Sequence, residues 1–417
     1  MNHVELSEIA AYVDERISSD AVSLEHYVTT DSLLQNKAGR EQAQNMPPNK
    51  VTLIKYQPGD VLVANIRPYL RKIWQADCSG GCSADVLAFR ARPNHSPDFL
   101  YAVLMQDAFF DHVMAGKKGA KMPRGDKKQI MRYLVPDVSA DKEQQIGQMM
   151  ASISQKISLN QRLNDNLESM AQALYDYWFV QFDFPDENGK PYKSSGGKMV
   201  WNEVLKREIP EGWGIDNITA IATIEGGGTP STQESSYWDG AIPFYTPKDA
   251  SEEFIAPSKT VRNTTPLGVE NSSTQIFSKA VFLTARGTVG RVQMPRVEMA
   301  MNQSCYALCP KESISLFYLF FVVRSIVKAL KVKANGAVFD AIVTRDILSI
   351  QLSQPNPSVI ELFTAKVTPI LMRLIATQSE LEELTKQRDF LLPLLMNGQV
   401  QVKPQGVNYH FMEYKNP

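Results

Sequence analysis

Residues 183–200 read DFPDENGKPYKSSGGKMV and lie in the middle of a chain of 417 residues. They follow the aromatic run Tyr175–Phe179, and apolar residues resume at Trp201. A polar stretch rich in Gly, Ser and Lys at this place is a surface loop, a disordered linker, or the joint between two copies of one unit. The sequence on either side of it decides between these alternatives.

The chain resembles itself when it is shifted by about 218 residues, which indicates an internal repeat. Tyr27 then falls on Tyr245, and Tyr101 falls on Tyr318. Further segments match at nearly the same offset: Gly59–Arg67 with Lys279–Arg286, Gly119 with Gly336, and Asp126–Ile130 with Val343–Ile347. A series of matches at one offset favours two copies of one unit, and we interpret the stretch around residues 185–212 as the linker between them.

Each copy ends in a long segment with the heptad spacing of a coiled coil. A helix of this length with one apolar seam needs a partner, and the obvious partner is its own repeat, packed antiparallel. Asn160 and Thr377 are polar at equivalent seam positions, where they either fix the register or are tolerated near solvent. The apolar seam residues are Ile146, Ile153, Ile157, Leu167 and Leu174 in the first helix and Val367, Ile370, Leu374, Leu381 and Leu384 in the second.

The remainder of each copy mixes strands and helices. Strand-like runs such as Asp60–Ala64 and Ala280–Thr284 stand between turns, and each copy has one shorter apolar helical segment. We therefore expect an α+β fold: two repeated α+β globules joined by two long antiparallel coiled-coil helices with pseudo-two-fold symmetry. The predicted segments are a first globule (1–140), a helix (141–184), a linker (185–212), a second globule (213–356), a second helix (357–398) and a tail (399–417).

The composition excludes several classes of protein. Hydrophobic residues make up 43% and charged residues 21%, which is a globular composition. No apolar run approaches the length of a membrane span, and the N-terminal segment lacks the regions of a signal peptide. With four cysteines, we expect a protein of the reducing cytoplasm. The net charge of −1 argues against binding nucleic acid through bulk positive charge, so such binding requires local patches or a larger assembly.

Basic residues cluster at matching places in both copies. Residues 116–132 read GKKGAKMPRGDKKQIMR, and residues 65–72 combine Arg and Lys with Tyr69 after a predicted strand. Lys suits phosphate as a point charge, and Arg can contact guanine through two hydrogen bonds. A solvated surface explains any single cluster, but the recurrence favours contact with nucleic acid. The candidate residues are Arg67, Tyr69, Arg71, Lys72, Lys117, Lys118, Lys121 and Arg124 in the first copy and Thr229, Tyr245, Lys248, Arg286, Arg291, Lys331 and Lys333 in the second.

The sequence offers little for catalysis. It contains neither of the common glycine-rich nucleotide loops. Pro97-Asp98 together with Asp126 and two following lysines fits the loose pattern of a metal-dependent nuclease, but the second copy has no counterpart. The two pairs of cysteines are spaced poorly for zinc, and the five histidines are scattered. We therefore expect no catalytic residue and no metal site.

Motifs around the joint resemble those of a known family, the specificity (S) subunit of type I restriction-modification enzymes. Residues 166–182, Gly189–Gly197 and Ile209–Trp213 look like the central conserved region of that family, and Asn397–Val400 looks like its C-terminal end. Other motifs match its target recognition domains: Gly227-Gly-Thr-Pro-Ser231, Tyr237-Trp-Asp-Gly240, Gly287-Thr-Val-Gly290 and Asn302-Gln303. The resemblance covers essentially the whole chain, although the first copy lacks the Gly-Gly-Thr-Pro and Asn-Gln motifs.

The resemblance implies DNA recognition without chemistry. Each globule would be a target recognition domain that reads one half of a bipartite asymmetric site in double-stranded DNA. The helices would dock two methyltransferase (M) subunits, which bring S-adenosylmethionine, and restriction/translocase (R) subunits, which bring ATP and Mg²⁺. This chain itself would bind no cofactor. Two alternatives remain open at this point: a stand-alone DNA nuclease, and a coiled-coil scaffold that does not bind DNA.

Overall fold

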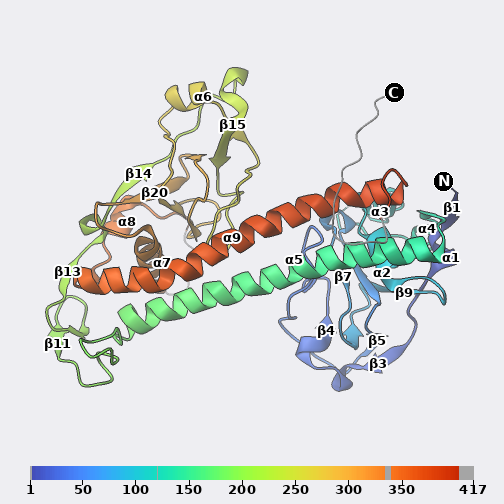
Figure 1. Cartoon of the computed structure of the whole chain (residues 1–417), viewed down its shortest axis with the longest axis horizontal. Coiled ribbons are helices and arrows are strands. Elements are labelled where there is room, and N and C mark those ends of the chain that lie inside the picture. The colour runs from blue at the N-terminus through green and yellow to red at the C-terminus, as the bar shows by residue number, and fades with distance from the viewer. Residues whose placement is uncertain (1, 120, 334–339, 403–417) are drawn as a thin grey trace. The chain divides into compact units, whose positions relative to one another are not determined.

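The structure is a computed structural model, which describes residues 2–119, 121–333 and 340–402. The chain divides into two compact units (Figure 1). The first unit consists of Met1–Gln161 together with Glu380–Pro417, and the second consists of Arg162–Ser379. Each unit therefore holds a globule and parts of both long helices. No helix in the described part of the chain is long and apolar enough to cross a membrane.

The first unit contains two small four-stranded sheets, with strand orders β2-β9-β6-β7 and β3-β5-β8-β4. All pairs are antiparallel except β4 with β8, and a separate short pair joins β1 to β10. The strands are β1 (His3–Glu5), β2 (Ala10–Tyr12), β3 (Arg16–Ser18), β4 (Tyr27–Val28), β5 (Thr52–Tyr56), β6 (Val61–Ala64), β7 (Ile73–Gln75), β8 (Gly80–Cys82), β9 (Val86–Ala91) and β10 (Leu134–Pro136). The short helices are α1 (Leu6–Ile9), α2 (Pro97–Leu104), α3 (Asp107–Ala115) and α4 (Lys127–Ile130).

The second unit repeats the first of these sheets, whereas its other sheet has three strands instead of four. Its sheets have the orders β14-β20-β17-β18 and β16-β15-β19, and β13 pairs with β21. The strands are β11 (Met199–Asn202), β12 (Arg207–Pro210), β13 (Gly214–Asp216), β14 (Ala222–Gly226), β15 (Trp238–Tyr245), β16 (Asn263–Thr264), β17 (Val281–Thr284), β18 (Val292–Gln293), β19 (Ala300–Met301), β20 (Cys305–Pro310) and β21 (Leu352–Gln354). The short helices are α6 (Pro266–Glu270), α7 (Leu316–Lys333) and α8 (Thr344–Leu348).

The registers of equivalent strands confirm the internal repeat. Val61 faces Phe89 in the first unit, as Val281 faces Leu308 in the second. The parallel pair β4·β8 of the first unit has a parallel counterpart, β15·β19, in the second. The mixed α+β class predicted from the sequence is therefore present in both units, and the sheets β2-β9-β6-β7 and β14-β20-β17-β18 share their strand order.

Two long helices, α5 (Ala140–Tyr175) and α9 (Pro357–Met396), pack antiparallel within each unit. In the first unit, Asn160 Nδ2 donates a hydrogen bond to Glu380 Oε2 over 3.0 Å. In the second unit, Asn164 Nδ2 donates to Gln378 Oε1 over 2.8 Å. Every apolar seam residue named above is buried or half-buried. The first helix ends earlier than predicted, because a single π-helical turn (Asp176–Val180) follows Tyr175.

The predicted linker, residues 185–212, is folded. Its second half forms the antiparallel hairpin β11-β12. The ring of Phe184 stacks on Tyr192 with centroids 4.7 Å apart and on Trp213 with centroids 5.2 Å apart. Asp183 accepts hydrogen bonds from Ser194, 2.7 Å from its backbone N and 2.6 Å from its hydroxyl. The polar stretch is thus a joint that packs on the core of the second unit, because the aromatic residues on either side of it are buried there.

Each unit has its own apolar core. In the first unit, helices α2 and α3 bury Phe99 and Phe109 against the sheet, where Phe109 meets Phe89 edge to face at 6.4 Å. The last turns of α9 complete this core with Leu392 and Leu395. In the second unit, aromatic side chains of α5, the π-helical turn after it, α7 and α9 form the corresponding cluster. Its members include Tyr175, Trp178, Phe179, Phe321 and Phe363.

Candidate nucleic-acid interface

In the first unit, the loop between β6 and β7 (residues 65–72) presents the first predicted basic patch. Arg67 is exposed, and Tyr69 keeps 52% of its surface accessible. Across the base of the loop, Ala64 N donates a hydrogen bond to Lys72 O over 3.1 Å. The backbone is left-handed at two positions, with φ of 52° at Arg67 and 51° at Arg71. The loop is therefore a tight turn that carries exposed side chains.

The second basic segment, of which residues 116–119 and 121–126 are described, contacts this loop. Arg67 N donates to Pro123 O over 2.9 Å, and Ile66 forms an antiparallel bridge with Arg124. A Cβ at Gly125 would come within 2.9 Å of Asn65 Oδ1, so only glycine permits this close approach. Two clusters that are separate in the sequence thus form one surface, which we call the first basic surface: residues 65–72, 116–119 and 121–126.

Several cations of the first basic surface are already paired. Lys118 forms an ion pair with Asp126, and Arg124 lies 3.2 Å from Asp85. The hydrogen bond from Lys118 and those from the backbone at the start of α4 hold the pKa of Asp126 low, at about 2. The side chains of Arg67, Lys117 and Lys121 are exposed and show no hydrogen bond or ion pair to any described residue. These three side chains are the ones available to an anionic partner.

A chain of ion pairs fixes the far end of the β6–β7 loop. Arg71 lies 3.0 Å from Asp107, whose other oxygen is 2.9 Å from the buried amine of Lys37. Lys37 is also 3.5 Å from Asp389 of α9, and its backbone N donates to Arg71 O over 2.9 Å. Lys72 donates to Thr30 O over 2.6 Å. Arg71 and Lys72 therefore hold the loop in place, whereas Arg67 is left for contact.

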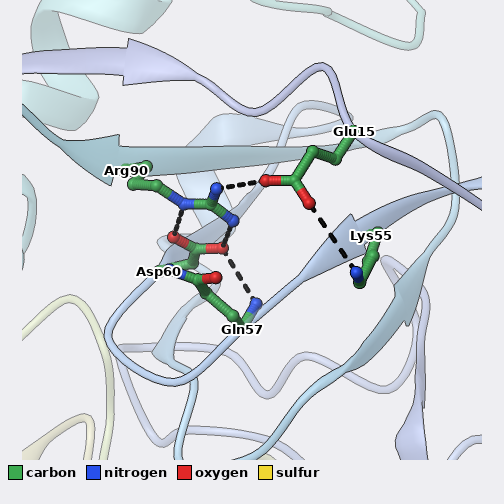
Figure 2. A network of polar contacts seen from close by, with 5 residues as sticks. All are labelled: Glu15, Lys55, Gln57, Asp60 and Arg90. Atoms are coloured by element: carbon green, nitrogen blue, oxygen red, sulfur yellow. Dashed lines mark hydrogen bonds and ion pairs between the residues drawn. The ribbon is translucent and has the colours of Figure 1, made fainter.

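A second network supports the turn before β6 (Figure 2). Asp60 is 1% exposed and accepts two hydrogen bonds from Arg90, at 2.7 Å from Nε and 2.8 Å from Nη2. Gln57 N donates to the same carboxylate over 2.9 Å. Arg90 also pairs with Glu15, which lies 3.8 Å from Lys55. The hydrogen bonds to Asp60 raise the pKa of Arg90, and the hydrogen bond from Arg90 lowers the pKa of Glu15. This network ties three segments together at the turn before β6.

The second unit has an equivalent loop between β17 and β18 (residues 285–291). Its left-handed positions are Gly287, with φ of 78°, and Gly290, with φ of 82°. Arg286 is exposed and forms an antiparallel bridge with Ala341, which matches the bridge between Ile66 and Arg124 in the repeat. A Cβ at Gly290 would lie 3.4 Å from Lys331 Cε, so that lysine borders the loop.

Two sequence motifs meet beside this loop. Thr229 of the Gly-Gly-Thr-Pro motif donates its hydroxyl to Gln303 Oε1 of the Asn-Gln motif. A Cβ at Gly227 would come within 2.1 Å of Asn302 O, so the motif glycine permits the contact. Ser304 O accepts hydrogen bonds from the backbone N of Ala285 and Arg286, at 2.8 and 3.2 Å. Gln303 is not among the predicted contact residues, although its motif is visible in the sequence.

Other predicted residues of the second unit lie in different environments. Lys248 is exposed beside Pro247, whose carbonyl accepts a hydrogen bond from Thr288 Oγ1 over 2.6 Å. Lys333 is exposed at the end of α7. Arg291 is half-buried in an ion pair with Glu252. Gly336, which matched Gly119 in the sequence, lies outside the described residues.

Tyr245 is a correction to the predicted site. It is fully buried, and its hydroxyl donates to the buried Gln293 Oε1 over 2.7 Å. Burial raises the pKa of this phenol well above its ordinary value. Tyr27, its repeat counterpart, is also buried. The repeated tyrosine is therefore a core residue of a parallel strand pair and not a contact residue. Its recurrence in the two copies reflects its packing in the core.

The structure gives the carboxylates of the loose nuclease pattern local structural roles. Asp98 accepts a hydrogen bond from Gln75 Nε2 over 2.9 Å, and Asp126 caps α4 by accepting from Lys128 N and Gln129 N. Within residues 2–119, 121–333 and 340–402, no group of three or more His, Cys, Asp or Glu side chains is arranged to hold a metal ion. All four cysteines have free thiols, and burial raises the pKa of Cys82 and Cys305 to about 12.

Much of the chain is similar to proteins of one known family. Residues 210–387 match the family described as type I restriction modification DNA specificity domain. The HindI specificity subunit of Haemophilus influenzae is 24% identical, over 95% of this chain and 98% of that protein. The MjaIX specificity subunit of Methanocaldococcus jannaschii is 32% identical, over 38% of this chain and 39% of that protein.

A solved structure shows the same fold. The crystal structure of a type I restriction-modification system S subunit from M. genitalium matches with a TM-score of 0.61. The match covers 95% of this chain and 96% of that chain, at 12% sequence identity. The likeness in fold thus extends over both units.

Proposed function

We propose that this chain is a specificity subunit of the type I restriction-modification family, whose model matches residues 210–387, and that it selects the DNA sequence on which a type I complex acts. It has no catalytic role of its own. The observation that carries this proposal is the repeated loop: each unit presents a turn between equivalent strands, bridged to a second loop and bordered by exposed basic side chains. Double-stranded DNA is the partner that such paired basic loops suit.

Each unit would read one half of a bipartite, asymmetric target. Each loop contains two arginines, but the other residues differ: residues 65–72 add a tyrosine and a lysine, whereas residues 285–291 add two glycines and a threonine. Loops of one geometry with different side chains would recognise different base pairs, and the major groove presents a distinct pattern for each pair. We assign the two recognition domains to residues 1–140 and 213–356, and we assign α5 and α9 to the conserved helical part.

The helices would dock the other subunits of the complex. Two methyltransferase subunits would bring S-adenosylmethionine, and restriction subunits would bring ATP and Mg²⁺, so this chain needs no cofactor. The net charge of −1 supports an assembly in which partners supply most phosphate contacts, because phosphate neutralisation dominates the affinity of DNA-binding proteins.

Sequencing of methylated bases in cells with and without this gene tests the proposal. We expect one methylated motif with two half-sites and an unspecified spacer, and we expect it to disappear when the gene is deleted. The purified chain should bind DNA specifically only together with a methyltransferase subunit. An unchanged methylation pattern after deletion, in cells that retain the methyltransferase genes, contradicts the proposal.

A further inference from the structure

The β6–β7 and β17–β18 loops share two left-handed positions but fill them differently. Arg67 lies three residues after the end of β6, and Gly287 lies three residues after the end of β17. Arg71 lies two residues before the start of β7, and Gly290 lies two residues before the start of β18. Both arginines of the first unit therefore replace a left-handed glycine of the second.

A left-handed backbone is unfavourable for a residue with a Cβ, because that atom crowds the following carbonyl oxygen. Glycine adopts the same φ without this penalty. The second unit shows that glycine builds this turn. A larger side chain at such a position therefore calls for an explanation in what the side chain contacts.

The structure explains Arg71. Its guanidinium lies 3.0 Å from Asp107, and its carbonyl accepts a hydrogen bond from Lys37 N over 2.9 Å. Its side chain therefore fastens the loop to α3. Arg67 lacks any such role, since its exposed guanidinium contacts no hydrogen-bonding or charged group among the described residues.

The backbone of Arg67 is nevertheless fixed. Its N–H donates to Pro123 O over 2.9 Å, and Pro68 follows it with a restricted φ. The exposed guanidinium thus belongs to a rigid turn that also carries the exposed Tyr69 and is bridged to the segment that carries Lys117 and Lys121. Lysines bind phosphate as point charges, whereas the planar guanidinium matches the two acceptors of guanine in the major groove.

On these grounds we propose that Arg67 reads a guanine within the half-site of the first unit, while Arg71 holds the loop. This inference rests on the proposed function and names the residue and base on which one half of the recognition depends. The lysines of residues 116–126 then supply phosphate contacts that set the register of the loop on the duplex.

The test uses the full chain, co-expressed with its methyltransferase subunits. In separate variants, the chain carries Arg67→Gly or Arg67→Lys. Lys206→Gly is the matched control, because Lys206 is an exposed left-handed cation with φ of 50° that pairs with Glu203 outside the loop. The readouts are the methylated motif, binding to duplexes substituted at each base pair, and the thermal midpoint of unfolding.

Arg67→Gly should unfold at a temperature no lower than the wild type. It should lose about ten- to a hundredfold of its preference for guanine at one position of one half-site. Arg67→Lys should keep the salt dependence of binding without restoring that preference, and Lys206→Gly should keep the wild-type motif.

Two results overturn the assignment of Arg67: an unchanged motif in Arg67→Gly, or a motif restored by Arg67→Lys, which would indicate a phosphate contact. A wild-type complex that methylates no bipartite motif would instead remove the proposed function on which the assignment rests. The two failures are therefore distinguishable.

Discussion

Glu168 of α5 accepts a hydrogen bond from the backbone N–H of Phe254, with 2.8 Å between its Oε1 and that nitrogen. Burial, together with the negative charges of Glu253 and Asp165, raises the pKa of this carboxyl to about 7. The hydrogen bond from Phe254 and the charge of Arg324 oppose this rise. Helix α5 is thus joined to a loop of the second unit by a carboxyl group whose pKa lies near 7.

Glu168→Gln should make the stability of the second unit less dependent on pH. The folded-state pKa lies above the unfolded one, so the protonated form favours folding. Its contribution is complete below about pH 4.5 and is lost as pH rises to about 7, by roughly 1–3 kcal/mol. Glutamine keeps the acceptor for Phe254 N–H without ionising. Thermal unfolding between pH 5 and 8 measures the difference, and parallel curves for both proteins would contradict the prediction.

Asp60→Asn should destabilise the first unit by about 2–4 kcal/mol. Arg90 then loses the negative charge of a buried carboxylate to which it donates two hydrogen bonds. Glu15→Gln is the matched control on the outer side of the same arginine, and we expect it to change stability little because that carboxylate is exposed. Denaturant unfolding of the two variants measures both effects. Equal losses of stability in the two variants would contradict the prediction, because the buried Asp60 would then contribute no more than the exposed Glu15.

Replacing both Asn164 and Gln378 with Leu should stabilise the helix pair of the second unit by about 1–2 kcal/mol. Both side chains are buried, and Asn164 Oδ1 has no hydrogen-bond partner among the described residues. Asn164→Leu alone should gain nothing, since it leaves the amide of Gln378 buried without its partner. The comparison of double and single variants in thermal unfolding decides the matter; a destabilised double variant argues for a role in fixing helix register.

Neutralising Lys117 and Lys121 to Gln should weaken binding of the complex to all DNA sequences. The slope of affinity against salt should fall by about one unit for each lysine that no longer neutralises a phosphate. Lys118→Gln should have a smaller effect, because Lys118 is already paired with Asp126. Titrations at several salt concentrations, on specific and non-specific duplexes, provide the measurement. A weakening confined to the specific duplex would indicate that these lysines touch bases instead.

The sequence predicted the periodic features well. The heptad spacing identified both long helices, and the seam positions from Ile146 to Leu384 are buried or half-buried because the spacing directly encodes which face is apolar. The internal repeat was also visible, since equivalent strands keep similar residues. The linker was not predicted as folded, because its packing depends on rings that stack from outside it, such as Phe184 on Trp213.

The candidate site was predicted in parts. Exposed cations such as Arg67 and Lys121 were identified by composition, but the sequence did not show that their two segments form one surface, since the bridge between Ile66 and Arg124 joins distant residues. Tyr245 was misassigned because a repeated aromatic residue has the same sequence signal in a core as at a surface. The pairing of Arg71 and Lys118 with acids likewise depends on tertiary contacts.

The first unit is built from two separate segments of the chain, and this affects how the protein folds during synthesis. The second unit is one continuous stretch, whereas the first combines two stretches that are far apart in the chain. Its core includes Leu392 and Leu395, and Lys37 meets Asp389 only once α9 is present. During synthesis, the second unit can complete its core before the last turns of α9 leave the ribosome, but the first cannot. The β6–β7 loop is therefore synthesised early but gains its support from α9 last, so a prematurely terminated product would carry this loop without that support.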